Sequence, residues 1–186
     1  MKIFQLQYDY EHDDKFVFFV IDESTLGFDR YDVEKGEMIY NWNDNIKITF
    51  DKTKGSFLSD YIANDLTWFI ITDKFKHLLN DYETGLVQYL PIKAFGKEKI
   101  DAYLLNICNL VDALNLDNSK YNIYELDDNE KMLSIQKYAL TGSNIGKFDI
   151  FRLKNDYFSI FVTERLKNAM KKNDITGCDF LEVKVV

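Results

Sequence analysis

The chain has little proline, glycine, cysteine or histidine: its 186 residues include one proline, eight glycines, two cysteines and two histidines. The scarcity of proline and glycine excludes a collagen-like chain, a proline-rich spacer and a flexible linker. Two cysteines are too few for a disulfide framework, and Cys108 and Cys178 both lie in apolar runs. We therefore expect reduced thiols in the core of a cytosolic protein.

Positive charge is also in short supply, because 23 lysines and arginines face 31 aspartates and glutamates, giving a formal net charge of −8. Nucleic-acid binding depends on basic residues that displace counterions from phosphates, so the charge argues against a nucleic-acid partner. A basic protein partner fits the charge better. The apolar run at residues 16–21 is too short to cross a bilayer or to act as a secretion signal. We expect a cytoplasmic protein that makes no membrane contact.

An internal repeat is the most informative feature of the sequence. Residues 68–93 and 159–184 align without a gap, so that Thr72 falls on Thr163 at an offset of 91 residues (163 − 72). Each copy has a β-branched and aromatic run, a threonine, an acidic residue and then helical apolar spacing. The threonine hydroxyl is expected to accept a free amide of the first helical turn. Each copy therefore predicts a strand, a short helix and a second strand.

The two predicted helices each carry one apolar stripe. The stripes consist of Phe75, Leu78, Leu79 and Tyr82 in the first copy and Leu166, Ala169 and Met170 in the second. Pro91, the only proline, predicts that the strand after the first helix lies at a sheet edge or ends there.

Further strands are predicted throughout the chain, and we also expect a helical turn at residues 59–65. The predicted strands are residues 2–8, 16–21, 45–50, 102–111, 122–126, 132–138 and 148–153. The fold class is therefore α+β, a sheet-rich fold with mixed or antiparallel sheets and two equivalent strand-helix-strand units, about 68–93 and 159–184. With 46% apolar and 16% aromatic residues, the chain can form one compact domain or two lobes that share a core.

No constellation for catalysis, cofactor binding or metal binding emerges from the sequence. His12 lies among acidic residues, His77 lies off the apolar stripe of its helix, and no ligand or nucleophile spacing accompanies either. Residues 142–148 lack the spacing of a phosphate-binding loop and indicate a turn instead. Paired carboxylates could still serve a hydrolase, but the sequence does not locate a pair. We assign no catalytic, cofactor or metal residue.

Features suited to protein binding are more evident. Trp42 lies in a polar turn, where its ring can serve as an anchor for a partner or fold back onto a sheet. Acidic residues could form a negative surface for a cationic partner. The candidate partner-binding residues are Trp42, Asp44, Asp13, Asp14, Asp127, Asp128 and Glu130.

Several short segments from residue 60 onward resemble a bacterial family, immunity protein family 11 of polymorphic toxin systems. The matching segments are DYI at 60–62, QYLPIK at 88–93, YLLNI at 103–107, VDALN at 111–115, IFRL at 150–153, FVTERLK at 161–167 and TGCDF at 176–180. They fall in the order of the family and cover roughly the last two-thirds of the chain. On this basis residues 60–186 form the family-like α+β part, and residues 1–59 form a strand-rich, variable N-terminal part.

The resemblance implies a protein that binds and neutralises a cognate bacterial toxin by protein–protein contact, without catalysis and without a cofactor. We expect that toxin to be basic. A small carboxylate-lined hydrolase or ligand-binding domain is the alternative, and a homodimer that pairs through exposed strand edges is a third hypothesis.

Overall fold

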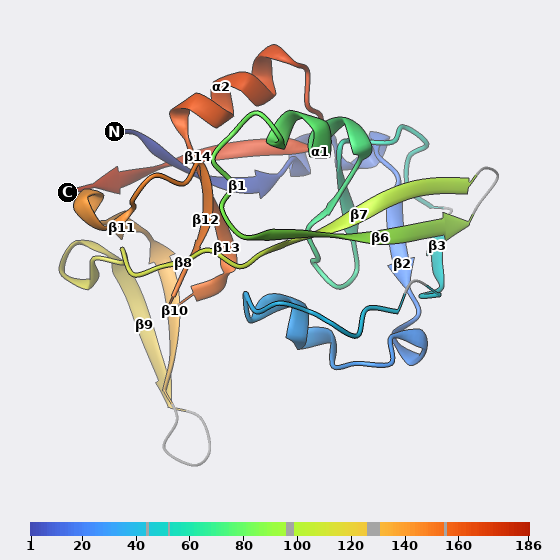
Figure 1. The fold of residues 1–186 in the computed structure, drawn as a ribbon, viewed down its shortest axis with the longest axis horizontal. Helices are drawn as coiled ribbons and strands as arrows, with labels where there is room; N and C mark the ends of the chain where they lie inside the picture. Colours follow the sequence, from blue (N-terminus) through green and yellow to red (C-terminus); the bar gives the residue numbers. More distant parts are fainter. Residues whose placement is uncertain (44, 52, 96–98, 126–130, 155) are drawn as a thin grey trace.

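The computed structural model describes residues 1–43, 45–51, 53–95, 99–125, 131–154 and 156–186. This part of the chain contains two sheets, one projecting hairpin and two short α-helices (Figure 1). Short 3-10 helices connect several strands, at Tyr10–Lys15, Glu23–Thr25, Arg30–Glu34, Leu116–Asn118 and Gly142–Asn144. The architecture is sheet-rich and agrees with the α+β class.

A six-stranded sheet contains both ends of the chain. Its strand order is β11 (Ala139–Leu140), β14 (Cys178–Val185), β1 (Ile3–Tyr8), β13 (Asp156–Thr163), β12 (Ile150–Leu153) and β8 (Leu110–Val111). The central pairs are antiparallel, whereas β11 and β8 add to the two edges in parallel. The sheet is therefore mixed.

The other sheet closes into a six-stranded barrel. Its order is β2 (Phe18–Ile21), β3 (Ile48–Phe50), β6 (Val87–Phe95), β7 (Lys99–Ile107), β5 (Ile70–Ile71) and β4 (Tyr61–Asn64). Two of its pairs, β2 with β4 and β3 with β6, are parallel. Because β1 lies in the first sheet while β2 and β3 lie in the barrel, the N-terminal third of the chain contributes to both bodies.

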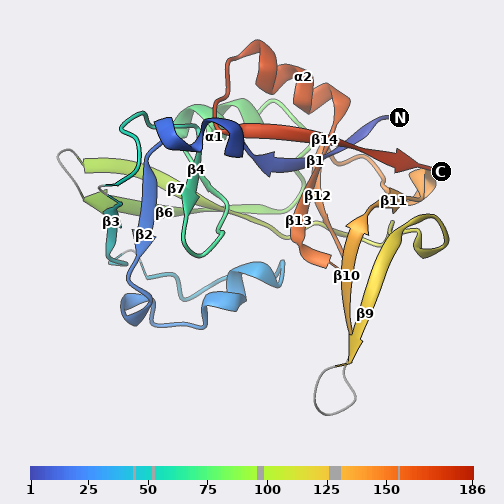
Figure 2. The same cartoon turned by 180° about the vertical axis from the view of Figure 1, so that it is seen from behind.

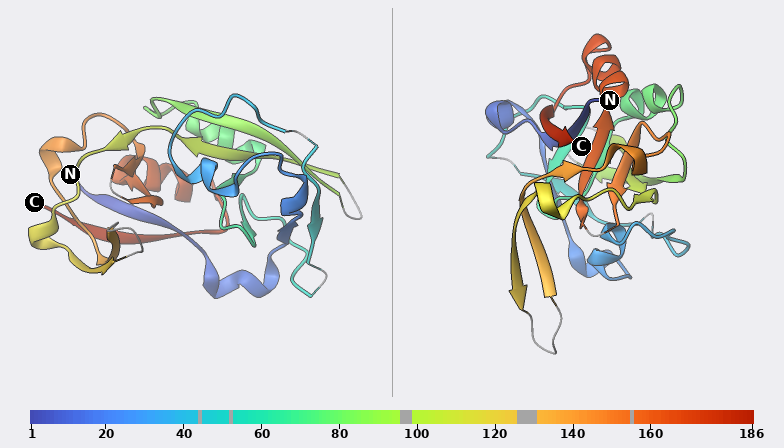
Figure 3. Two further views of the ribbon diagram at one scale, coloured as in Figure 1. Left: turned by 90° about the horizontal axis from the view of Figure 1, so that it is seen from below. Right: turned by 90° about the vertical axis from the view of Figure 1, so that its left-hand side faces the viewer.

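A hairpin of β9 (Lys120–Glu125) and β10 (Lys131–Lys137) stands away from the rest of the molecule (Figures 1 and 2). In the right-hand view of Figure 3, the hairpin extends below both sheets. At its base, the Tyr138 hydroxyl bonds to the Asp156 carboxylate and lies 2.7 Å from the Ser159 hydroxyl. The base of the hairpin is thereby attached to β13.

The helices α1 (Asp73–Leu79) and α2 (Glu164–Lys172) lie side by side (Figures 1 and 3). Phe75, Leu79, Leu166 and Met170 are all buried in a core cluster that also contains residues of both sheets. The predicted apolar stripes are thus confirmed. This shared cluster holds the barrel against the six-stranded sheet.

Each helix connects two strands that run in the same direction. Around α1 the strands are β5 and β6, with antiparallel β7 between them; around α2 they are β13 and β14, with antiparallel β1 between them. The threonines before the helices differ in detail. Thr163 Oγ1 accepts from the Leu166 amide at 3.3 Å, as expected of an N-cap, but Thr72 makes no side-chain cap hydrogen bond.

Several sequence expectations need correction. The helical turn expected at residues 59–65 is wrong, because this segment forms β4 and pairs with β2 and β5. The strand expected at residues 102–111 is interrupted at Cys108 and Asn109, where the chain leaves the barrel for the six-stranded sheet. The Asn109 side chain accepts from the Leu86 amide at 2.8 Å, which fixes this crossing point.

Pro91 lies inside β6 and does not end the strand. Among the described residues, β3 pairs with β6 only at Ala94 and not at Pro91, which fits the alternative expectation of an edge position. At Pro91, β6 instead contacts a side chain. Trp42 Nε1 donates a hydrogen bond to the Pro91 carbonyl at 2.9 Å. A proline is tolerated here because its missing amide is not needed by a neighbouring strand.

Candidate functional site

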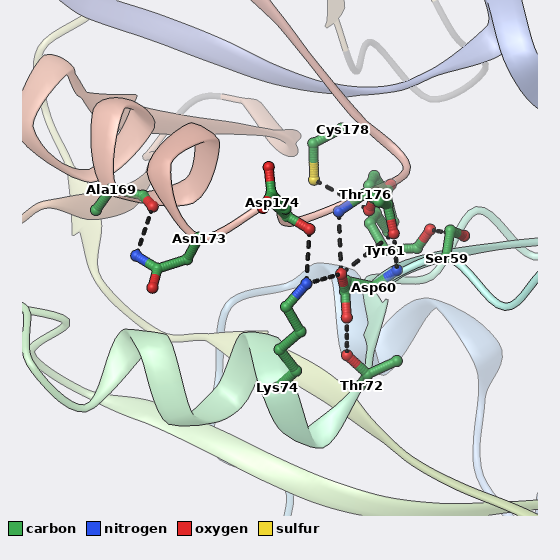
Figure 4. A network of polar contacts seen from close by, with 10 residues as sticks. All are labelled: Ser59, Asp60, Tyr61, Thr72, Lys74, Ala169, Asn173, Asp174, Thr176 and Cys178. Carbon is green, nitrogen blue, oxygen red and sulfur yellow. Dashed lines mark hydrogen bonds and ion pairs between the residues drawn. The ribbon is translucent and has the colours of Figure 1, made fainter.

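A buried carboxylate connects α1 to the loop that follows α2 (Figure 4). Asp60 Oδ1 accepts from the Thr72 hydroxyl at 2.6 Å, and Oδ2 accepts from the Thr176 amide at 3.0 Å and from Lys74 Nζ at 3.1 Å. The Thr176 hydroxyl adds a further bond to Oδ2 at 3.1 Å. Four donors on the protein itself therefore satisfy a side chain in a residue that is 7% exposed.

A second buried carboxylate, Asp149, connects α2 to the loop that follows α1. Asp149 Oδ1 accepts from the Thr163 hydroxyl at 2.6 Å, and Oδ2 accepts from the Glu83 amide at 3.1 Å, in the loop after α1. Arg165 donates to both carboxylate oxygens. Burial alone would raise the pKa of Asp149, but these hydrogen bonds outweigh it and hold the pKa below its ordinary value.

The two networks are reciprocal. Each aspartate binds the threonine and the cation at the start of one helix, and it also binds the loop that follows the other helix. In both cases the threonine amide donates to the aspartate carbonyl at 3.0 Å. Both carboxylates are fully used in holding the helix pair, so their chemistry is structural.

A cavity of about 400 Å³ lies where the barrel meets the six-stranded sheet. Aromatic side chains from both bodies line it, including Tyr8 of β1, Tyr61 of β4 and Trp68, which precedes β5. Glu34 and Arg152 supply charged groups. Thr67 on the same wall has a positive φ of 56°, a backbone conformation that is strained for a β-branched residue.

Arg152 is 6% exposed, although it carries a charge. Its Nη1 donates to the Val33 carbonyl at 3.0 Å, and its Nε is buried without a hydrogen-bond partner among the described residues. Burial lowers the pKa of Arg152 to about 10, so the guanidinium remains charged at neutral pH. Burial also raises the pKa of Glu34, with Arg152 acting in the opposite direction.

The model of the immunity protein family Imm11 matches residues 2–185. The chain belongs to this family. The match includes the N-terminal segment before residue 60, where the sequence motifs gave no resemblance. Among curated proteins, no match to the chain is found.

The Imm11 protein places Trp42 against the barrel. The ring centroid lies 5.4 Å from that of Phe28 and 6.3 Å from that of Trp68, and the side chain is half-buried. Together with the bond to the Pro91 carbonyl, these contacts match the folded-back placement. Whether the exposed part of the ring also contacts a partner stays a prediction.

The acidic candidates of the Imm11 protein fall in separate segments. Asp13 and Asp14 belong to the 3-10 helix Tyr10–Lys15, and Asp14 is exposed. The remaining candidates lie outside the described residues: Asp44, Asp127, Asp128 and Glu130. The structure therefore leaves their partner-binding role as a prediction.

Burial affects both cysteines, and each histidine lies beside an aspartate. Both cysteines are free, and burial raises the pKa of Cys108 and raises the pKa of Cys178 well above the ordinary thiol value. His12 Nδ1 lies 2.9 Å from Asp9, and His77 Nδ1 lies 3.1 Å from Asp73, both partly or largely exposed. Within the described ranges, no group of three or more acidic, histidine or cysteine side chains could hold a metal ion.

Among the described residues, neither α1 nor α2 nor any other helix has the length and apolar character that spanning a membrane requires.

Sequence reasoning missed the two aspartate networks and the cavity. Asp60 and Asp149 lie outside the repeated segments, at unequal distances of 12 and 14 residues before their threonines (72 − 60 and 163 − 149). The aspartate networks could have been inferred from the repeated triplet of a threonine, an acidic residue and a cation, at residues 72–74 and 163–165. The cation of each triplet needs an anionic partner near the start of its helix. Arg152 gave a signal too, as the single charge in the apolar strand IFRL.

Proposed function

We propose that this Imm11 protein binds and neutralises a cognate bacterial toxin by protein–protein contact, without catalysing a reaction. The observation that carries the proposal is the family match over residues 2–185, nearly the whole chain. The reserve of negative charge supports a basic toxin as the partner. We place this activity in the cytoplasm of a bacterium.

The β9–β10 hairpin is the surface that we propose for the toxin. It stands clear of both sheets (Figures 1 and 2). Its Ile123 and Tyr124 are 54% and 50% exposed. Exposed tyrosines of this kind often carry much of the energy of a protein interface. The segment that joins the two strands contains the acidic candidates Asp127, Asp128 and Glu130. Exposed Ile and Tyr side chains next to acidic residues suit a basic partner.

The remaining candidates form a second, smaller proposal. Asp13 and Asp14 would add acidic contacts from the 3-10 helix before β2, and Asp44 would do so beside Trp42.

We also infer that the β5-α1-β6 and β13-α2-β14 segments are two equivalent units. The support is the constant offset of the two sequences and the reciprocal Asp60 and Asp149 networks. In this view the paired units form an inert scaffold that presents the hairpin.

The test is capture of the toxin domain encoded next to this protein, combined with rescue of growth when both are expressed. We expect capture and rescue by the wild type, and weakened capture by Tyr124→Ala. Tyr31→Ala is the matched control, because Tyr31 is 48% exposed, close to the 50% of Tyr124, and lies in the 3-10 helix Arg30–Glu34, which contains none of the candidate partner-binding residues. Absence of both capture and rescue would contradict the proposed function, whereas equal capture by the two variants would contradict only the hairpin surface.

The hydrolase alternative requires at least two carboxylates that converge with tyrosine. Of the described residues that line the tyrosine-rich cavity, only Glu34 is a carboxylate. The described lining of this cavity therefore does not meet that requirement. Pairing of two copies through strand edges is tested by light scattering over a range of concentrations, where a constant monomer mass would contradict it.

A further inference from the structure

The cavity at the junction of the two sheets has the dimensions of a small-molecule site. Its volume of about 400 Å³ is within the range of roughly 300–1,000 Å³ that such sites occupy. It is lined by residues of β1, β4, β7, β12 and β13, so both bodies of the fold must be in place to form it. It shares none of the residues that we propose for toxin binding.

Arg152 is the residue of this cavity whose buried charge indicates a ligand. A buried charge is costly unless an opposite charge or a full set of hydrogen bonds compensates it. Within the described part of the chain, Arg152 donates only to two backbone carbonyls, of Val33 and Glu34, and forms no ion pair. Its Nε has no partner at all there. A ligand carboxylate is the group that a guanidinium binds best, through charge-assisted and bidentate hydrogen bonds.

The walls determine what the rest of the ligand can be. Tyr61 stacks on Phe69 with ring centroids 4.5 Å apart, and Trp68 has an indole N–H without a partner among the described residues. Tyr10 and Phe158 also line the cavity and are 76% and 70% exposed, so an aromatic rim is open to solvent. Flat aromatic walls favour a flat apolar body, through burial and ring packing.

We propose that this cavity binds a small aromatic monocarboxylate, with its charge beside Arg152 and its ring among Tyr8, Tyr61 and Trp68. A single negative charge matches the single guanidinium. A dianion such as a phosphate monoester is disfavoured, because Glu34 lies on the same wall and the whole protein carries a net charge of −8. This inference is independent of toxin neutralisation.

Benzoate is the probe, titrated calorimetrically into the full-length protein. We expect saturable one-to-one binding, with benzyl alcohol and phenyl phosphate each about tenfold weaker or worse. Trp68 provides a second readout in the Trp42→Phe variant, whose remaining tryptophan lies in the cavity wall. Lack of any heat or fluorescence change up to about 10 mM benzoate would overturn the proposal. Equal binding of benzyl alcohol, or tighter binding of phenyl phosphate, would overturn it as well.

Variants separate the charge effect from damage to the fold. Arg152→Met keeps an apolar stem without the charge, and we expect about a tenfold or greater loss of benzoate affinity in a protein with an unchanged circular dichroism spectrum. Glu34→Gln should tighten binding several-fold, since it removes a like charge beside the ligand. Arg30→Met is the matched control. Arg30 begins the 3-10 helix that ends at Glu34, but it does not line the cavity.

Glu34→Gln keeps the proposal testable if Arg152→Met fails to fold. Unchanged benzoate affinity in folded Arg152→Met would refute the role of the guanidinium, and weaker binding in Glu34→Gln would refute the charge argument.

Discussion

Removal of the Asp60 carboxylate should destabilise the protein far more than removal of an exposed acid in the same region. In Asp60→Ala, the Thr72 hydroxyl, the Thr176 amide and the Lys74 ammonium all lose their acceptor. The Thr176 amide and the Thr72 hydroxyl belong to partly buried residues. Lys74 also donates to the Asp174 carbonyl at 2.6 Å, and its side chain is 51% exposed, so its loss contributes little.

The size of this destabilisation follows from the donors that are left without an acceptor. Each buried donor left without a partner costs about 1–3 kcal/mol. The two partly buried donors, the Thr72 hydroxyl and the Thr176 amide, together with the lost helix-to-loop connection, give a decrease in the free energy of unfolding of about 4 kcal/mol, the middle of the summed range. For a chain of this size that corresponds to a fall in Tm of about 8–16 °C.

The assay is urea unfolding followed by circular dichroism, with Asp73→Ala as the matched control. Asp73 is also an aspartate at the start of α1, but its side chain is 57% exposed, and within the described part of the chain its only ion pair is with His77. Its loss should cost less than about 1 kcal/mol. If Asp60→Ala lowers the free energy of unfolding by no more than Asp73→Ala does, the account of the reciprocal networks is wrong.

Three further predictions follow from the same contacts. Gly177→Ala should destabilise the protein by about 2–4 kcal/mol, because φ is +77° and a Cβ atom would clash with the Tyr61 carbonyl oxygen. Urea unfolding measures the loss, and a loss below about 1 kcal/mol would contradict this prediction. Because the folded pKa of Asp149 is lowered, its contribution to stability is complete above its unfolded pKa of about 4 and is lost as pH falls below it. Unfolding curves at several pH values should therefore show a steeper acid loss in the wild type than in Asp149→Asn, and parallel profiles would refute the assignment. Cys108 and Cys178 should react slowly with a disulfide reagent at pH 7 and rapidly after unfolding, since burial raises both thiol pKa values; fast labelling of the native protein would contradict their placement.

The helices and most strands could be predicted because their signals are local. The apolar stripes through Phe75 and Leu166 require only the period of a helix, and the structure buries both residues. The segment at residues 59–65 was mistaken for a helical turn because its short mixed pattern carries no strong period. Its strand pairing with β2 and β5 is a tertiary effect.

The contacts that define the candidate sites could not be predicted for a different reason. The Asp60 network joins residues 116 positions apart, and the bond from Trp42 to the Pro91 carbonyl spans 49 positions. No local pattern encodes which loops meet across two sheets. Arg152 stands out as the single charge in β12, but its partners could not be predicted, because β12 is buried on both faces and alternation along the strand carries no information there.

The stoichiometry of inhibition tests the central claim most directly. The proposed cognate toxin is held at a fixed concentration well above its dissociation constant, and its residual activity is measured as the purified protein is added. Neutralisation by binding predicts a straight decline that reaches its end point near one equivalent, independent of incubation time. Progressive loss of toxin activity with a small fraction of one equivalent would show turnover and would contradict the claim.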